Sequence, residues 1–258
     1  LSKQSIPEGG EDGSAGFLFF ETADGYQFKS IDKLFDKQQK KSYIFNNSTD
    51  AKEGIPAGYD GKILQHQADS SINVQSKMNM GAYKTKLVMF DPYNCKYVVD
   101  EKTADEAVEK KKVKLAGKGL PVFNEKFKTP TKDFTRTTFM MIDSGTLPSG
   151  ATEEQIKENQ KDNFKAAQTL NQAIRRYNQL FSSMMQITIA GDFSLHAGDV
   201  IFVDIFSVKG EKDDTVNKES GGLYIIADLC HYVDSAGTYT KLNLARDSFG
   251  RKGNHSRR

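Results

Sequence analysis

Four consecutive segments in the last third of the chain constrain the fold most, because their apolar residues recur at every second position or in short runs. The segments are QITIAG at 186–191, DVIFVDIF at 199–206, GLYIIADLCHYV at 222–233 and TYTKLNLARD at 238–247. This spacing is typical of β-strands, whose successive side chains point to opposite faces of a sheet. Consecutive strands predict an antiparallel meander, and a meander of this length can close into a barrel.

A long helix is predicted before these strands, at about 153–185. Thr152 and Gln155 have the spacing of a capping box, and Glu153 and Glu154 suit the positive end of the helix dipole. Apolar residues then recur three and four positions apart, which predicts one continuous apolar face. They are Ala167, Leu170, Ile174, Tyr177, Phe181 and Met184. Such a face covers a sheet or forms a seam between subunits, and we favour the sheet.

Two hairpins and a short helix are predicted before residue 100. GFLFF and YQF flank a tight turn at ADG, and Ser30 can cap a short helix at 31–39. GAYKTKLVMF and CKYVV flank DPYN, which is typical of a hairpin turn. Apolar residues at 72–80 fit a helix or a strand, and Gly81 would end a helix there.

These elements predict an α+β fold that is mainly β, with an antiparallel barrel, a flanking long helix and a smaller α+β region. The expected organisation is a linker at 1–16, an α+β region at 17–99, a charged loop or insertion at 100–133, a β-barrel domain at 134–250 and a flexible basic tail at 251–258. The chain begins with Leu1 rather than Met, so we expect it to be the later part of a longer polypeptide.

Charge gives little functional information. The 36 basic and 34 acidic residues leave a net charge of +2, so no global field favours nucleic acid. The run Lys110-Lys111-Lys112 is interpreted as part of an exposed loop rather than as a phosphate site. Gly117-Lys118-Gly119 lacks both the spacing of a phosphate loop and a preceding strand.

One catalytic motif requires a decision. FMMIDSGT at 139–146 has the local pattern of an aspartic protease, but that chemistry needs two carboxylates that share one proton. The chain has a single DSG, so Asp143-Ser144-Gly145 is interpreted as a turn between a strand and a loop. A DSG-type aspartic peptidase remains an alternative function, and a small-ligand-binding β-barrel module is a third.

Metal sites and cysteine chemistry are not indicated. The four histidines show no metal-binding spacing, and Cys95 and Cys230 are far apart in the sequence. Cys230 and His231 are neighbours on a predicted strand, so they face opposite sides; we expect a buried cysteine and an edge histidine. We therefore predict no catalytic, cofactor-binding or metal-ligating residues, and no enzyme activity.

The order of motifs in the last third resembles the baseplate central hub proteins of contractile-tailed bacteriophages, which are related to the hub domains of type VI secretion spikes. The matching residues are Arg176-Tyr177, Gly191, Leu195, Gly198-Asp199, Ser220-Gly221, Tyr224, His231, Thr240, Leu242, Leu244 and Arg246-Asp247. Two earlier segments, at 19–34 and 81–97, are also similar to this family.

The resemblance implies a tail-tube-like barrel at 134–250 and a structural role without a cofactor. Three subunits would form a pseudo-sixfold ring that joins the tail tube to the central spike and encloses the DNA passage. The implied partners are two further copies, the tail tube protein, the spike protein, other baseplate proteins and, transiently, genomic DNA. The implied location is the baseplate of the virion tail, with assembly in the host cytoplasm and no membrane insertion by this chain.

Overall fold

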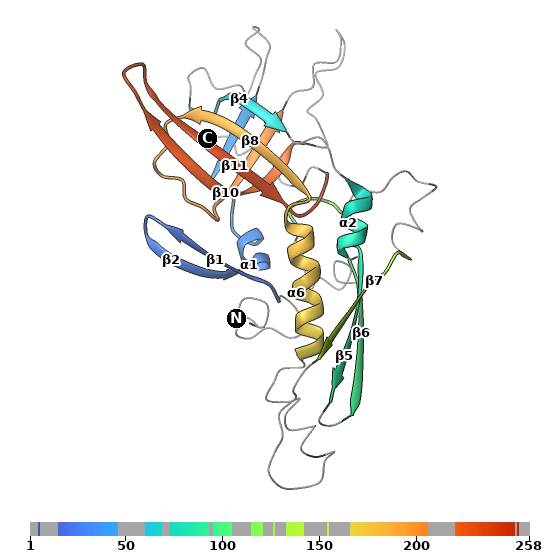
Figure 1. Cartoon of the computed structure of the whole chain (residues 1–258). Helices are drawn as coiled ribbons and strands as arrows, with labels where there is room; N and C mark the ends of the chain where they lie inside the picture. Colours follow the sequence, from blue (N-terminus) through green and yellow to red (C-terminus); the bar gives the residue numbers. More distant parts are fainter. Residues whose placement is uncertain are drawn as a thin grey trace. The chain divides into compact units, whose positions relative to one another are not determined.

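The computed structural model describes residues 5, 15–45, 60–68, 73–92, 95–104, 115–120, 126, 133–141, 154, 166–205, 220–250 and 252. They belong to two compact units. The first unit comprises Leu1–Leu18, Asn73–Val113 and Val122–Asn178, and the second comprises Phe19–Ile72, Lys114–Pro121 and Gln179–Arg258. Strands dominate the described part of the chain (Figure 1), which confirms the expected α+β, mainly β class.

The first unit contains a three-stranded sheet in the order β6-β5-β7, formed by β5 (Lys84–Asp91), β6 (Lys96–Thr103) and β7 (Arg136–Met141). β5 is antiparallel to β6 and parallel to β7, so the hairpin expected around DPYN is confirmed. Helix α6 (Ala166–Leu180) covers one face of this sheet, where Leu170 packs against Leu87 and Met89 of β5.

The ambiguous segment before Gly81 is a helix, α2 (Val74–Met80). The side chain of Asn73 caps its first turn by accepting the N–H of Ser76 at 2.9 Å. Gly81 ends the helix with φ +87°, a left-handed conformation that costs glycine little. A methyl group on Gly81 would lie 2.7 Å from Cγ2 of Thr85, so the turn also requires glycine for space.

The long helix ends earlier than its apolar pattern predicts. α6 stops at Leu180, and the last predicted member of its apolar face, Met184, instead lies exposed on strand β8 (Ser183–Ala190). Between them, the N–H of Ser182 donates to the carbonyls of Gln179 and Arg246, which turns the chain into the sheet. The expected capping box at Thr152 lies outside the described residues.

The second unit contains a six-stranded sheet in the order β3-β9-β10-β11-β8-β4. Besides β8, it is built from β3 (Lys41–Phe45), β4 (Ile63–Ala68), β9 (Val200–Ile205), β10 (Gly222–Val233) and β11 (Thr238–Arg246). All neighbours are antiparallel except β3 and β9.

All four predicted strands are present, but their predicted neighbour order is wrong at one step. β9, β10 and β11 form a meander, whereas β8 pairs with β11 on the far side from β9. The connection from β8 to β9 crosses over these strands: Gly191 N–H donates to the Thr238 carbonyl of β11, and Gly198 N–H donates to the Ile226 carbonyl of β10. These contacts are distant in sequence, so the pattern of the strands does not reveal them.

Strands β3 and β4 were not predicted, and they form the two edges of the sheet. A single bridge between Ile44 on β3 and Lys62, just before β4, brings these edges together, so the sheet curls towards a barrel. Apolar side chains fill its concave face, and the predicted alternation is confirmed on β11. Leu242 and Leu244 are buried in this core, whereas Lys241 and Asn243 are exposed.

The remaining elements of the second unit agree with the sequence pattern. β1 (Phe17–Thr22) and β2 (Gly25–Ser30) form a two-stranded sheet around a two-residue turn. Ser30 caps α1 (Ile31–Phe35) by accepting the N–H of Lys33 at 3.2 Å, although this helix is shorter than predicted. Among the described residues, no helix has the length and apolar character needed to cross a membrane.

Candidate functional site

Most of the residues that carry the family resemblance lie on the strands and turns of the curled sheet, whereas Arg176 and Tyr177 lie on α6 in the first unit. Arg246, at the end of β11, is fully buried. Its guanidinium lies 4.7 Å from the ring centroid of Tyr224 and 5.5 Å from that of Phe249. Nη1 donates to the carbonyl of Gly221 at 3.1 Å, and Tyr224 O–H donates to the carbonyl of Ser220 at 2.7 Å.

Arg246 and Tyr224 influence each other's pKa in this buried contact. Burial lowers the pKa of the Arg246 guanidinium, while Tyr224 and Asp247 oppose that effect. Burial also raises the pKa of Tyr224, with Arg246 opposing. Arginine nevertheless keeps its charge at neutral pH, and two aromatic faces with a carbonyl replace part of its hydration. Arg246 therefore ties the Ser220-Gly221 segment to the end of β11.

Asp247 and the following serine hold a segment of the region predicted as a charged insertion. Asp247 accepts the N–H of Ala116 at 3.0 Å, and Ser248 Oγ accepts the N–H of Gly117 at 2.6 Å. Leu115, Ala116 and Gly117 are buried as a result.

The segment Gly117-Lys118-Gly119, which lacks the pattern of a phosphate loop, is hydrogen-bonded to the chain's own backbone. The N–H groups of Lys118 and Gly119 both donate to the carbonyl of Phe249, at 2.6 and 3.3 Å. A phosphate loop needs such N–H groups to point at the ligand. Here both N–H groups are already hydrogen-bonded to the backbone of Phe249. Gly117 also has no room for a methyl group, which would lie 2.5 Å from the Phe249 oxygen.

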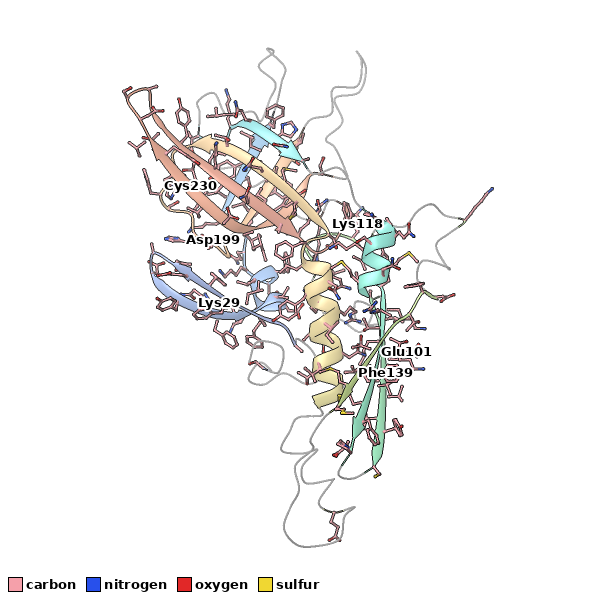
Figure 2. The ribbon with its side chains drawn as sticks, in the orientation of Figure 1. Lys29, Glu101, Lys118, Phe139, Asp199 and Cys230 are labelled. Carbon is pink, nitrogen blue, oxygen red and sulfur yellow. The ribbon has the colours of Figure 1, made fainter. Side chains whose placement is uncertain are left out.

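The turn before β9 is fixed by Gly198 and by Asp199, which Figure 2 labels. Gly198 has φ +78°, and Asp199 accepts the N–H of His196 at 3.0 Å and the Nζ of Lys40 at 2.7 Å. Lys37 donates to the Gly198 carbonyl at 2.9 Å. Burial lowers the pKa of the Lys37 ammonium, Lys29 adds to this effect, and Asp199 opposes it.

A second carboxylate, Asp192, anchors β3 to the same connection. It accepts hydrogen bonds from Lys41 Nζ, from Tyr43 O–H at 3.0 Å, and from the N–H and hydroxyl of Ser194 at 3.0 and 2.7 Å. Burial disfavours the charged form, but the hydrogen bonds from Lys41, Ser194 and Tyr43 outweigh it and lower the pKa of Asp192. The ionised carboxylate is thus satisfied by the fold rather than presented to a substrate.

The expectation of a buried Cys230 beside an edge histidine is wrong for the cysteine, which is exposed. β9 pairs only with the first four residues of β10, so Cys230 lies on the part of β10 that β9 does not cover. His231 is half-buried; its Nδ1 lies 2.9 Å from Thr240 Oγ1, and its ring packs 4.6 Å from Phe193. Within the described parts of the chain, no three His, Cys, Asp or Glu side chains are placed to hold a metal ion.

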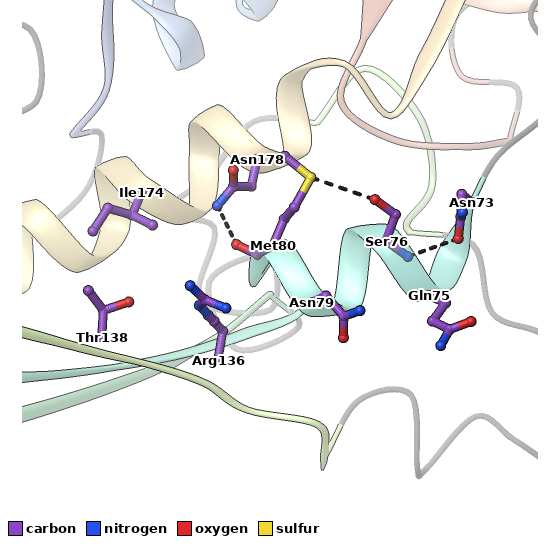
Figure 3. A pocket seen from close by; sticks show the side chains of 9 residues that line it. All are labelled: Asn73, Gln75, Ser76, Asn79, Met80, Arg136, Thr138, Ile174 and Asn178. Carbon is purple, nitrogen blue, oxygen red and sulfur yellow. Dashed lines mark hydrogen bonds between the residues drawn. The ribbon is translucent and has the colours of Figure 1, made fainter.

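An open pocket of about 640 Å³ lies in the first unit, between α2, β7 and α6 (Figure 3). Asn178 of α6 donates to the Met80 carbonyl, and Ser76 Oγ lies 3.9 Å from the Met80 sulfur. The lining residues are Asn73, Gln75, Ser76, Asn79, Met80, Arg136, Thr138, Ile174 and Asn178. This set offers amides, hydroxyls and one guanidinium, but no carboxylate or imidazole that could act as a general base.

Sequence reasoning missed a polar contact between α6 and the three-stranded sheet. The Asn171 amide donates to the Asp100 carboxylate at 2.8 Å and to the Asp100 carbonyl at 3.0 Å. One turn later, Arg175 donates to the Thr103 carbonyl. The predicted face consists of apolar residues, whereas the i, i+4 spacing of Asn171 and Arg175 is the sequence signal for this polar contact.

The turn Asp143-Ser144-Gly145 lies outside the described residues, and β7 ends two residues earlier at Met141. The interpretation of this motif as a turn therefore stays a prediction, as does the peptidase alternative.

The chain is similar in structure to two solved tail proteins, at low sequence identity. No protein-family model matches the chain, and no curated protein matches its sequence. It is similar to the crystal structure of a tail protein from Neisseria meningitidis MC58, with a TM-score of 0.43 and 11% identity, over 90% of this chain and 50% of the other. It is also similar to the 43 kDa tail protein of prophage MuSo2 from Shewanella oneidensis, with a TM-score of 0.41 and 12% identity, over 90% of this chain and 51% of the other. The chain spans about half the length of each of these phage or bacterial tail proteins.

Proposed function

We propose that this chain is a structural subunit of the baseplate hub of a contractile phage tail. In this proposal three copies form a pseudo-sixfold ring that joins the tail tube to the central spike and encloses the DNA passage. The observation that carries it is the role of the residues that resemble the hub family: within the second unit they set the turns and the register of one curled sheet.

The polar members of this set support a structural role because their partners are main-chain groups or neighbouring turns. Arg246 binds the Gly221 carbonyl, Asp247 binds the Ala116 N–H, and Asp199 binds the His196 N–H. A catalytic side chain must instead reach the reacting atom of a substrate. These side chains are turned into the wall, where each one fixes the path of the backbone.

The proposed tube-like domain at 134–250 contains β7, α6 and the strands β8 to β11. β7 pairs with β5 in the three-stranded sheet, whereas β8 to β11 lie in the six-stranded sheet. The six-stranded sheet takes two further strands, β3 and β4, from the region at 17–99, so we infer that this region contributes to the same ring wall. A sheet that curls with few open edges suits a ring, because unpaired edges invite uncontrolled association. The proposed partners are the tail tube, the spike and other baseplate proteins, with DNA passing transiently through the lumen.

The proposal is tested by locating the chain in assembled tails. Tails carrying an epitope-tagged copy are purified, labelled with gold-conjugated antibody and viewed by electron microscopy. We expect gold at the baseplate end and three copies of the chain per tail by quantitative mass spectrometry. Absence from the tails, or gold along the whole tube, would refute the hub assignment.

A further inference from the structure

The outer face of the three-stranded sheet in the first unit is apolar and exposed. In the strand register, Val88 of β5 lies opposite Val99 of β6 and Phe139 of β7, and Phe90 lies opposite Tyr97 and Met141. Opposed residues share a face of a sheet. We define the outer sheet face by these six residues: Val88, Phe90, Tyr97, Val99, Phe139 and Met141.

This face is larger than the scattered apolar residues of an ordinary surface. Its four outermost members, two on β6 and two on β7, are between 57% and 80% exposed. A large side chain has an accessible surface of about 150–250 Å². Multiplied by their exposed fractions, the surfaces of these four side chains sum to an exposed area on the order of 500 Å². A contiguous apolar patch of that size is typical of an interaction site.

A second exposed apolar face lies on the hairpin of the second unit. Phe19, Tyr26 and Phe28 are between 46% and 71% exposed, and the rings of Phe19 and Tyr26 stack with centroids 5.7 Å apart. We define the hairpin face by these three residues, which together expose on the order of 400 Å².

The two faces carry opposite charges at their borders. Lys84 and Lys86 precede Val88 and Phe90 on the same face of β5; Lys84 pairs with Glu101 at 2.6 Å, and Lys86 leaves one positive charge in excess. Beside the hairpin face, Glu21 and Asp24 are exposed and negative. Contact between the faces would pair apolar surface with apolar surface and positive borders with negative ones.

We propose that the outer sheet face of one copy docks on the hairpin face of a second copy. The two faces offer roughly 900 Å² of apolar surface, and their charged borders can bring the contact into the range of about 1,200–2,000 Å² that stable complexes bury. A contact between two different faces leaves one of each kind free on every pair, so further copies can add until a ring closes. The inference rests on the proposed ring-forming function and names the surfaces of its subunit contact.

Mixing two variants of the purified chain tests this pairing. Phe139→Lys removes the most central residue of β7 from the outer sheet face, and Tyr26→Lys does the same for the hairpin face. Val233→Lys is a matched control, because Val233 is 71% exposed on β10 and belongs to neither face. Sedimentation velocity over a range of concentrations measures association, and far-UV circular dichroism checks the fold.

We expect the unmodified chain and the Val233→Lys control to associate equally, and each face variant alone to associate at least tenfold more weakly. An equimolar mixture of the two face variants should form dimers and nothing larger, because one intact pair of faces remains. If a lysine variant loses its fold, Phe139→Ser and Tyr26→Ser replace it.

Three results would overturn the inference: a monomeric unmodified chain at millimolar concentration, face variants that associate normally, or loss of association in Phe139→Lys while Tyr26→Lys associates like the unmodified chain. The last result would indicate that two outer sheet faces bind each other. None of these outcomes depends on where gold labels the tail, so the inference can fail while the hub assignment stands.

Discussion

Replacing Asn171 with alanine should weaken the contact between α6 and the three-stranded sheet and so lower the free energy of unfolding. Asn171 is fully buried, and its amide donates both to the carboxylate and to the carbonyl of Asp100 on β6. Alanine at this position leaves two buried acceptors without this donor. Lys102, 3.5 Å from the other carboxylate oxygen, can compensate only in part because that ion pair is already made.

The expected cost follows from these contacts. A hydrogen bond to a charged group contributes about 1.5–3 kcal/mol, and one to a neutral carbonyl contributes about 0.5–1.5 kcal/mol. Alanine recovers about 0.5 kcal/mol through its higher helix propensity. We therefore expect Asn171→Ala to lower the free energy of unfolding of the first unit by about 1.5–4 kcal/mol.

A urea titration followed by circular dichroism measures the free energy of unfolding, and hydrogen exchange of β5 and β6 peptides localises the change. Asn178→Ala is the control, because it makes the same substitution on the same helix but loses one bond at the open pocket. The reasoning is wrong if the two variants differ by less than about 0.5 kcal/mol.

Three further outcomes are expected. Gly198→Ala should lower the free energy of unfolding, measured by thermal denaturation, by about 3 kcal/mol, because its methyl group would lie 2.6 Å from Phe20 and the backbone there is left-handed. Gly25→Ala is the control: its surroundings are open, so only the backbone strain should lower the free energy of unfolding. The folded-state pKa of Asp192 lies below its unfolded value of about 4. Its contribution is therefore full above pH 4 and is lost as the pH falls through the folded value, so Asp192→Asn should destabilise the protein at pH 7 and flatten its acid unfolding curve. Asp143→Asn should leave tail assembly and infectivity unchanged, and loss of a measured peptide cleavage would instead support the peptidase alternative.

The strands of the last third were predictable because each carries its own two-residue period, which reports a strand without any knowledge of its neighbours. Their order was not predictable. Pairing of β8 with β11 depends on the connection between Gly191 and Asp199, whose backbone bonds to Thr238 and Ile226 lie far along the chain. Length and turn residues favour adjacent pairing, and here tertiary hydrogen bonds override that preference.

The two missed edge strands and the buried polar residues of α6 have a common physical cause. KSYIF and ILQHQA are short, and each is stabilised by the strand beside it rather than by its own pattern. Asn171 is polar, so a count of apolar spacing assigns it to solvent, yet it is buried because β6 supplies acceptors. The candidate site was predictable only as an ordered set of turn residues, since the partners of Arg246 and Asp247 come from segments that the sequence separates widely.

Two kinds of side chain among the described residues should respond differently to substitution. Charged side chains such as Arg246 and Asp192 are turned inward onto backbone and neighbouring turns, while aromatic side chains such as Phe139 and Tyr26 remain at the surface. Substitutions of the first kind should therefore lower the free energy of unfolding without a specific effect on association, because those groups meet only their own chain. Substitutions of the second kind should weaken association at unchanged stability, since an exposed side chain contributes little to its own fold. The proposed ring subunit would need this separation, because its turns would have to hold their shape while its outer faces bind the next copy.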